Sequence, residues 1–130
     1  MSSSFEYERR VAFADTDMAG VAHFTSILRW VEEAEAACLR ARGDTLCRRE
    51  ADGGLTGWPK VAVAADFLRP VRFDETVVVS LEVVREGRSS REWKFEIRRA
   101  ADSVEIARGT MKVVRTVLTP SGEAKSVPIA

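Results

Sequence analysis

Apolar residues recur at steps of three and four positions between Ser26 and Arg42, which is the spacing of one face of an α-helix. Charged residues fall largely elsewhere, so the apolar face is suited to packing in a core. Thr25 or Ser26 can cap the start of this helix, and Gly43 supplies a left-handed stop at its end. The sequence therefore predicts one amphipathic helix over residues 26–42. Its apolar face comprises Ile27, Trp30, Val31, Ala34, Cys38 and Ala41.

β-Branched and aromatic residues, in places alternating with charged ones, mark the predicted strands. These strands cover residues 5–14, 60–68, 76–85, 90–100 and 104–118. Turn-forming residues join the last four strands by short links, which implies antiparallel neighbours. Residues 44–59 are rich in glycine and predict a loop, which can include a short helical piece over residues 46–51.

The last predicted strand changes the face on which its apolar residues lie. Val104 and Ile106 occupy even positions, whereas Met111 and Val113 occupy odd ones. A β-bulge near Gly109 would make this switch. A leading strand, one long helix and a run of antiparallel strands describe an α+β domain in which the sheet wraps around the helix. Such a sheet has edge strands to cover, and dimerisation is one way to cover them.

The length of 130 residues predicts a single domain over residues 1–130, with residues 1–4 as a flexible tail. Acidic and basic residues balance at 20 each, which does not indicate a nucleic-acid partner. The chain has neither a secretory signal pattern nor an apolar stretch near the ~20 residues of a membrane helix, so we expect a cytoplasmic protein without a membrane partner. Cys38, Cys47 and the single histidine, His23, show no metal-ligand spacing, so no metal site is expected.

The residues most suited to catalysis lie just before the predicted helix. This segment brings two carboxylates, a flexible position and an imidazole close to the unpaired N–H groups of a helix N-terminus. The residues are Asp15 and Asp17, Gly20, and His23. Such a place can hold a carbonyl group and attack it. The alternative for Asp17 is a turn or cap aspartate that accepts hydrogen bonds from nearby amides. His23 can act in catalysis or serve in packing and hydrogen bonding.

Four segments resemble the 4-hydroxybenzoyl-CoA thioesterase family of hotdog-fold proteins. They are RVAFADTDMAG at residues 10–20, RWVEEA at 29–34, FLRPVRFDE at 67–75 and GRSS at 87–90, so the likeness extends through nearly the whole chain. The resemblance implies a hotdog fold and the hydrolysis of an acyl thioester of coenzyme A or of acyl carrier protein. It also implies a homodimer or homotetramer, a site at the dimer interface, and no metal or redox cofactor.

By this resemblance Asp17 matches the family's catalytic aspartate, which acts as a nucleophile that forms a mixed anhydride or as a general base for water. The backbone N–H of Phe24 matches the donor that polarises the thioester carbonyl. Gly20 would let the chain approach the acyl group closely. His23 departs from the family pattern, so its candidacy for catalysis rests on its own chemistry.

Arg88, Ser89 and Ser90 lie in a predicted hairpin that can hold the nucleotide phosphates of coenzyme A; the alternative is a solvated hairpin tip. The acyl pocket is expected between the helix start and the loop through Gly57 and Trp58. The sequence does not distinguish aromatic, short branched and long fatty acyl groups as the substrate's acyl group. We expect an acyl-CoA thioesterase, and the alternative is a non-catalytic hotdog module that binds acyl-CoA or acyl carrier protein. The motif does not resemble that of a third class, the hotdog dehydratases.

Overall fold

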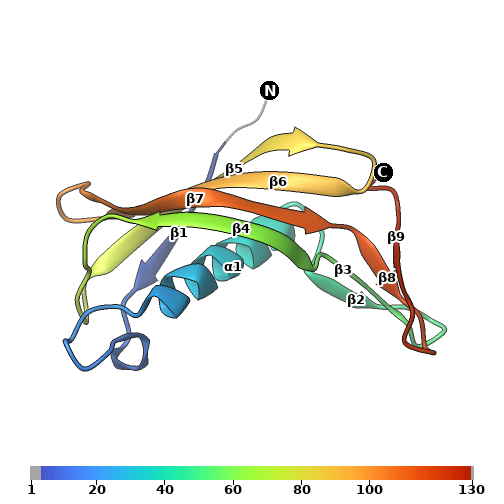
Figure 1. Cartoon of the computed structure of the whole chain (residues 1–130), viewed down its shortest axis with the longest axis horizontal. Helices are drawn as coiled ribbons and strands as arrows, with labels where there is room; N and C mark the ends of the chain where they lie inside the picture. The colour runs from blue at the N-terminus through green and yellow to red at the C-terminus, as the bar shows by residue number, and fades with distance from the viewer. Residues whose placement is uncertain (1–3, 130) are drawn as a thin grey trace.

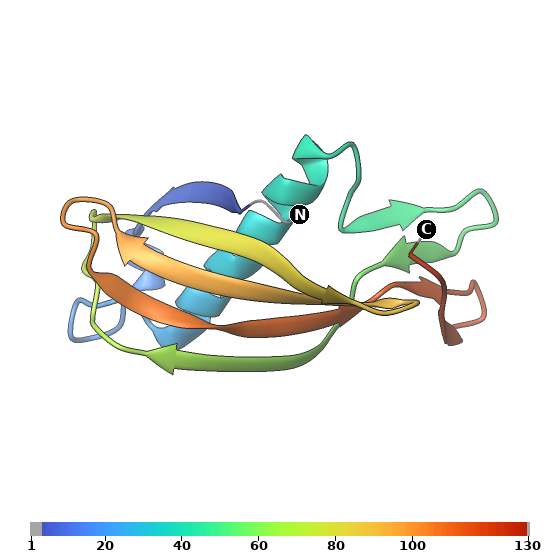
Figure 2. The same ribbon diagram turned by 90° about the horizontal axis from the view of Figure 1, so that it is seen from above.

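The computed structural model describes residues 4–129 as a curved antiparallel sheet wrapped around one α-helix, with a smaller sheet beside it (Figure 1, Figure 2). This arrangement confirms the α+β hotdog fold expected from the sequence. Of the predicted flexible tail, residues 1–3 lie outside the described residues. In chain order the elements are β1 (Phe5–Arg10), the short 3₁₀ helix η1 (Phe13–Asp15), α1 (Phe24–Ala41), β2 (Cys47–Arg49), β3 (Leu55–Gly57), β4 (Lys60–Phe67), β5 (Thr76–Glu86), β6 (Ser90–Arg99), β7 (Glu105–Val114), β8 (Thr116–Leu118) and β9 (Ala124–Ser126).

Five strands form the large sheet in the order β1-β5-β6-β7-β4, and every neighbouring pair is antiparallel. The small sheet has the order β2-β3-β8-β9. Because β7 leads directly into β8, the two sheets follow each other along the molecule, as Figure 2 shows. β4 is an edge of the large sheet, so its outer side is open to a further strand.

The core lies between α1 and the face of the large sheet that curves around it. Trp30 and Cys38 of α1 are fully buried, as are Trp93 of β6 and Val113 of β7. Burying a large apolar side chain contributes about 1.5–3 kcal/mol each, so this cluster holds the helix to the sheet. Burial also raises the pKa of the Cys38 thiol, in keeping with the predicted role of this residue as a small hydrophobe.

The helix begins earlier than the sequence pattern predicts. α1 starts at Phe24, so the predicted caps Thr25 and Ser26 are wrong and both lie inside the first turn. His23 is the N-cap, and its Nδ1 accepts the Thr25 N–H at 3.2 Å. An imidazole nitrogen replaces the expected hydroxyl there, because His23 is the residue that has the extended backbone of an N-cap. At the other end Gly43 has φ +77°, which confirms the left-handed stop.

Other boundaries differ where tertiary contacts override local preference. The leading strand stops at Arg10 because η1 turns the chain, and the Asp15 carboxylate stabilises that turn by accepting the Ala12 N–H at 2.8 Å. The helical piece predicted over residues 46–51 is wrong, since residues 47–49 form β2, which pairs with β3. The strand predicted over residues 104–118 is divided into β7 and β8, and β9 follows without a signal in the pattern. Strands of three residues depend on their partners more than on their own propensity.

The predicted change of buried face in β7 occurs, but the bulge lies at Ile106 rather than near Gly109. Ile97 pairs with Ala107 and the next residue of β6 pairs with Glu105, so Ile106 is the extra residue. Gly109 serves a different purpose. A Cβ at this position would lie 2.7 Å from the ring of Phe95 on β6, so only glycine permits β7 to pack this closely against that ring.

Candidate active site

Asp15 anchors the loop between β1 and α1. Its side chain is 2% exposed and accepts hydrogen bonds from the Ala12 N–H at 2.8 Å, from Arg9 Nη1 at 2.9 Å and from Arg29 Nη2 at 2.5 Å. Burial by itself raises the pKa of Asp15, but these donors outweigh burial and hold the pKa below its ordinary value. Asp15 is therefore a charged structural support of the loop.

Asp17 lies at the exposed tip of the same loop. Thr16 and Ala22 form an isolated β-bridge that closes the loop behind it. The Asp17 N–H donates to the Val21 carbonyl at 2.9 Å, and Asp17 Oδ1 accepts the Ala19 N–H at 2.8 Å. The other carboxylate oxygen makes no hydrogen bond within residues 4–129. Oδ1 thus stabilises the turn, as expected of a turn aspartate, and the other carboxylate oxygen is available to act as a nucleophile or a base.

Gly20 lets this loop double back. Its φ is +77°, which a residue with a side chain adopts only with strain, and its N–H donates to the Asp17 carbonyl at 3.0 Å. Val21 then forms a bridge with Arg72, and the Ala22 N–H donates to the Val71 carbonyl at 2.8 Å. The return of the chain leads directly from the Asp17 tip into the start of α1.

The start of α1 presents an unpaired donor. The Asp15 carbonyl accepts the His23 N–H at 2.8 Å and the Ser26 hydroxyl at 3.0 Å, which holds the first turn in place. Phe24 is the first helical residue, and its N–H makes no hydrogen bond in the described part of the chain. An N–H at the positive end of a helix dipole is suited to polarise a carbonyl oxygen.

The His23 imidazole is engaged in capping the same turn. Its Nδ1 lies 2.7 Å from the Thr25 hydroxyl oxygen in addition to accepting the Thr25 N–H. The ring also stacks on the Phe24 ring, with a centroid distance of 4.8 Å. These contacts are those of a cap and packing residue, which is one of the two roles left open by the sequence.

The predicted phosphate ligands lie far from this loop within one chain. They belong to the β5–β6 hairpin, which lies at the opposite end of the large sheet from the loop between β1 and α1 (Figure 1). The residues are Arg88, Ser89 and Ser90. The Ser89 carbonyl accepts the Arg115 N–H at 2.7 Å, which fixes the hairpin to the segment between β7 and β8. The Arg88 side chain is exposed. The structure therefore groups the candidate residues into two sets at two ends of the molecule.

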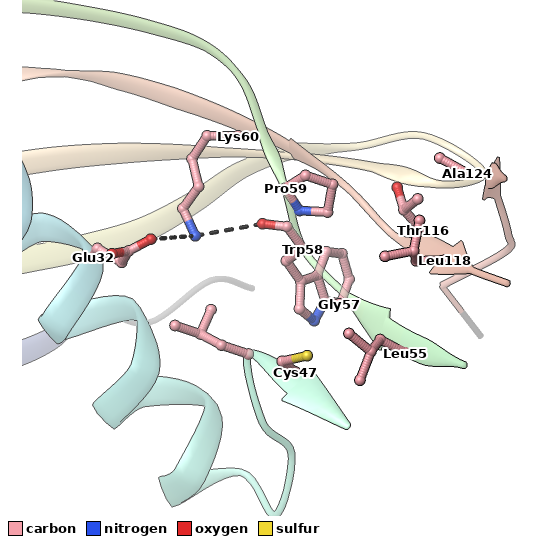
Figure 3. A pocket seen from close by; sticks show the side chains of 11 residues that line it. Glu32, Cys47, Leu55, Gly57, Trp58, Pro59, Lys60, Thr116, Leu118 and Ala124 are labelled. Carbon is pink, nitrogen blue, oxygen red and sulfur yellow. Dashed lines mark hydrogen bonds and ion pairs between the residues drawn. The ribbon is translucent and has the colours of Figure 1, made fainter. Parts of the chain in front are cut away.

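A cavity of about 550 Å³ lies between α1 and the small sheet (Figure 3). Glu32 and Lys60 supply charge at its edge, where Lys60 Nζ lies 3.4 Å from Glu32 Oε2. The cavity is close to the hairpin end of the sheet, because Arg91 at the start of β6 lies over the ring of Trp58. The remaining wall is largely apolar and includes Leu46, Cys47, Leu55, Trp58, Pro59 and Leu118.

The cavity contains two residues that the sequence places in the wall of an acyl pocket, Gly57 and Trp58. From the helix, Glu32 in the middle of α1 lines it rather than residues at the start of α1. Leu46 and Leu55 were not identified, because they lie in the segment that was predicted as a loop. Leu118 was placed in a strand without any indication of a cavity, since only the pairing of β3 with β8 brings it there.

Asp66 lies on the exposed sheet surface, where Arg108 Nε is 3.9 Å from its carboxylate. Among the described residues, no group of three or more His, Cys, Asp or Glu side chains is placed to hold a metal ion. Within residues 4–129, no helix combines the length and apolar character needed to cross a membrane.

Comparison with known proteins places the chain in a family. Residues 19–106 match the model of the Thioesterase superfamily, and the chain belongs to that superfamily. The 1,4-dihydroxy-2-naphthoyl-CoA hydrolase of Synechococcus sp. (strain WH7803) is 31% identical over 99% of this chain and 86% of its own length. The enzyme of the same name from Synechococcus sp. (strain CC9311) is 30% identical over 82% of this chain and 73% of its own.

Solved structures agree with this placement. A 1,4-dihydroxy-2-naphthoyl-CoA thioesterase from Synechocystis covers 98% of this chain and 90% of its own, with a TM-score of 0.82 and 26% identity. The 4-hydroxybenzoyl-CoA thioesterase from Pseudomonas sp. strain CBS-3 shares the fold, with a TM-score of 0.78 and 17% identity over 98% of this chain and 94% of its own. Within its superfamily the protein is an acyl-CoA thioesterase, an enzyme that hydrolyses an acyl thioester to a free acid and the CoA thiol.

Proposed function

We propose that the protein hydrolyses an aromatic acyl-CoA thioester in a site shared by two copies of the chain, with Asp17 from one copy and the acyl cavity from the other. The relatives' named substrate, 1,4-dihydroxy-2-naphthoyl-CoA, supports an aromatic acyl group. The cavity also supports an aromatic acyl group. Its volume of about 550 Å³ lies within the range of pockets that hold small organic ligands, and its wall combines the Trp58 ring with apolar neighbours.

The positions of the Asp17 loop and of the cavity at the two ends of β4 carry this proposal. β4 begins at Lys60, which lines the cavity, and ends at Phe67, whose ring lies 6.0 Å from the Phe24 ring at the start of α1. The loop that carries Asp17 and the cavity are therefore at opposite ends of one edge strand. Antiparallel pairing of two β4 strands about a two-fold axis exchanges these ends, so Asp17 of the partner subunit would come to this cavity.

The surface of β4 supports a dimer through this edge. Val61, Val63 and Phe67 are 57%, 47% and 46% exposed, although they are apolar. An exposed edge strand with apolar side chains is a template for pairing with another chain. A homodimer is the smallest assembly that completes the proposed site, and a homotetramer would contain two such dimers.

In the proposed mechanism, the Phe24 N–H and the dipole of α1 stabilise negative charge on the thioester oxygen. The free carboxylate oxygen of Asp17 attacks the carbonyl carbon to form an anhydride, or removes a proton from an attacking water. In either route the C–S bond breaks and the thiolate of CoA leaves; in the first route a water then hydrolyses the anhydride, which releases the acid and regenerates the Asp17 carboxylate. Gly20 gives the acyl group room beside the loop, and His23 supports the reaction by capping the helix that carries the Phe24 N–H.

The β5–β6 hairpin is the proposed binding site for the CoA phosphates. Arg88 is exposed and makes no ion pair within the described residues, so its guanidinium is available to a phosphate. Ser89 and Ser90 add hydroxyl groups beside it. This hairpin is at the cavity end of the chain, so the nucleotide and the acyl group would contact the same copy.

A panel of acyl-CoA thioesters with a thiol-detecting readout tests the substrate class. We expect the highest kcat/KM on aromatic acyl groups and lower values on short branched and long fatty ones. Preference for a long aliphatic acyl group would contradict the aromatic assignment. Hydrolysis with acyl carrier protein as the thiol carrier, at a rate equal to that with CoA, would contradict the role of the Arg88 hairpin.

Mixed dimers test the shared site. Asp17→Asn removes the catalytic carboxylate, and Cys47→Trp fills the cavity from an exposed position, so each variant alone should be inactive. In a refolded equal mixture, half of the dimers carry one intact Asp17 opposite one open cavity, which restores about a quarter of the wild-type activity. A site within one chain predicts no recovery at all, which would reject the shared site. A mixture of Asp17→Asn with the double variant is the matched control and should stay inactive.

A further inference from the structure

The cavity contains a hydrogen-bond donor without a partner. Trp58 is 4% exposed, and its indole Nε1 is buried without a hydrogen-bond partner among the described residues. Figure 3 shows the indole among the residues that line the cavity, with its nitrogen on the edge turned toward Cys47 and Leu55. Buried tryptophan N–H groups normally find an acceptor, so an unpaired one in a cavity wall points to an acceptor that arrives with a ligand.

The Trp58 ring is held in one orientation. The guanidinium carbons of Arg91 and Arg115 lie 4.5 and 5.2 Å from the ring centroid. The Trp58 carbonyl accepts a hydrogen bond from Lys60 Nζ at 3.4 Å, which connects its backbone to the start of β4. Because both the ring and the backbone are held, the N–H cannot turn to solvent without losing these contacts. The indole N–H groups of Trp30 and Trp93 also lack a partner among the described residues, but both rings are wholly buried in the core and neither lines the cavity.

We infer that Trp58 is a specificity-determining residue, whose indole N–H donates a hydrogen bond to an oxygen substituent on the acyl ring. This inference rests on the proposed function, since it takes the cavity to be the acyl site. An oxygenated ring satisfies the donor, whereas a plain hydrocarbon ring leaves it unpaired in an otherwise apolar wall. A site with a buried donor discriminates against the analogue that lacks the matching group. The other lining side chains, such as Leu55 and Leu118, contact either ring equally well.

Kinetics on a matched pair of thioesters test this role. Trp58→Phe removes the N–H and keeps an aromatic ring in the wall. We expect it to lower kcat/KM for 1,4-dihydroxy-2-naphthoyl-CoA about tenfold to a hundredfold more than it lowers kcat/KM for 2-naphthoyl-CoA, whose ring offers no acceptor. Trp58→Leu is the control for ring packing, because it should lower both values. Equal losses on the two thioesters in Trp58→Phe would reduce Trp58 to a packing residue and overturn the inference.

A binding measurement tests the N–H directly and does not depend on turnover. In a ¹H–¹⁵N spectrum of the wild-type protein, the indole signal that disappears in Trp58→Phe belongs to Trp58. We expect 1,4-dihydroxy-2-naphthoate to move this signal downfield, as a new hydrogen bond does, and 2-naphthoate to leave it in place. If the wild type hydrolyses the thioesters and the signal responds alike to both acids, the inference fails while the proposed function stands. If the wild type hydrolyses neither thioester, the proposed function fails and the inference fails with it.

Discussion

Lys60 Nζ lies 2.6 Å from Oε1 of Glu35, and this pair joins the start of edge strand β4 to the buried side of α1. Glu35 is 1% exposed, so burial raises the pKa of its carboxyl group, while the Lys60 ammonium opposes that rise. The same ammonium reaches Glu32 and the Trp58 carbonyl. One cation therefore compensates a buried carboxylate and holds one side of the cavity.

Removing that cation should be costly. Lys60→Met leaves the Glu35 carboxylate buried and unpaired, and we expect a loss of about 3 kcal/mol in the free energy of unfolding at neutral pH. A carboxyl group with a raised pKa in the folded state opposes folding when it is ionised, so the loss should shrink as the pH falls and Glu35 takes up a proton. Urea unfolding at pH 7 and pH 5 measures both effects. The double variant Glu35→Leu with Lys60→Met should recover most of the stability, and no recovery would show that Lys60 acts through other contacts.

Asp17→Asn should keep the fold and the affinity for substrate while it lowers kcat by at least ~10²-fold. The amide oxygen still accepts the Ala19 N–H, so the turn survives, but an amide neither attacks the carbonyl as a carboxylate does nor takes up a proton. Steady-state kinetics with circular dichroism as the fold check measure this. His23→Ala is the comparison, because loss of a helix cap costs about 1 kcal/mol of stability and should affect kcat less. Near wild-type turnover in a folded Asp17→Asn variant would mean that Asp17 only shapes the turn.

Arg88→Glu should raise KM for acyl-CoA far more than it lowers kcat. The nucleotide end of CoA lies away from the reacting carbonyl, so its contacts stabilise the bound substrate and the transition state about equally. The same variant should match the wild type on a truncated acyl-pantetheine thioester, which lacks the nucleotide. A defect of equal size on the truncated substrate would indicate that Arg88 supports the hairpin rather than the phosphates.

Asp15 should make the protein sensitive to acid. Its pKa is lowered in the folded state, so its contribution to stability is complete above the ordinary aspartate pKa of about 4 and is lost as the pH falls through the lower, folded value. In Asp15→Asn the buried charge is absent, and Arg9 and Arg29 lose their shared partner. We expect this variant to be less stable at pH 7 and to show a weaker decline below pH 4, as measured by thermal unfolding across pH. Parallel curves for variant and wild type would show that other carboxylates cause the acid response.

The candidate catalytic loop was accessible to prediction because its residues are close together in the chain. Asp17, Gly20, His23 and Phe24 lie within eight positions, and the loop that carries them depends on local turns and a helix start. The capping role of His23 was not accessible, since it depends on where the first helical turn begins. The two arginine partners of Asp15 were not accessible either, because one comes from β1 and the other from α1.

By itself the sequence determined α1, the long strands and the α+β class, because burial of one face imposes a period of 3.6 residues on a helix and of two on a strand. It also predicted the change of buried face in β7. Only the tertiary structure decided where the bulge at Ile106 lies, how the three-residue strands pair, and which residues form the cavity. Leu55 and Leu118 meet there because β3 pairs with β8, and such a contact between distant segments leaves no local period in the sequence.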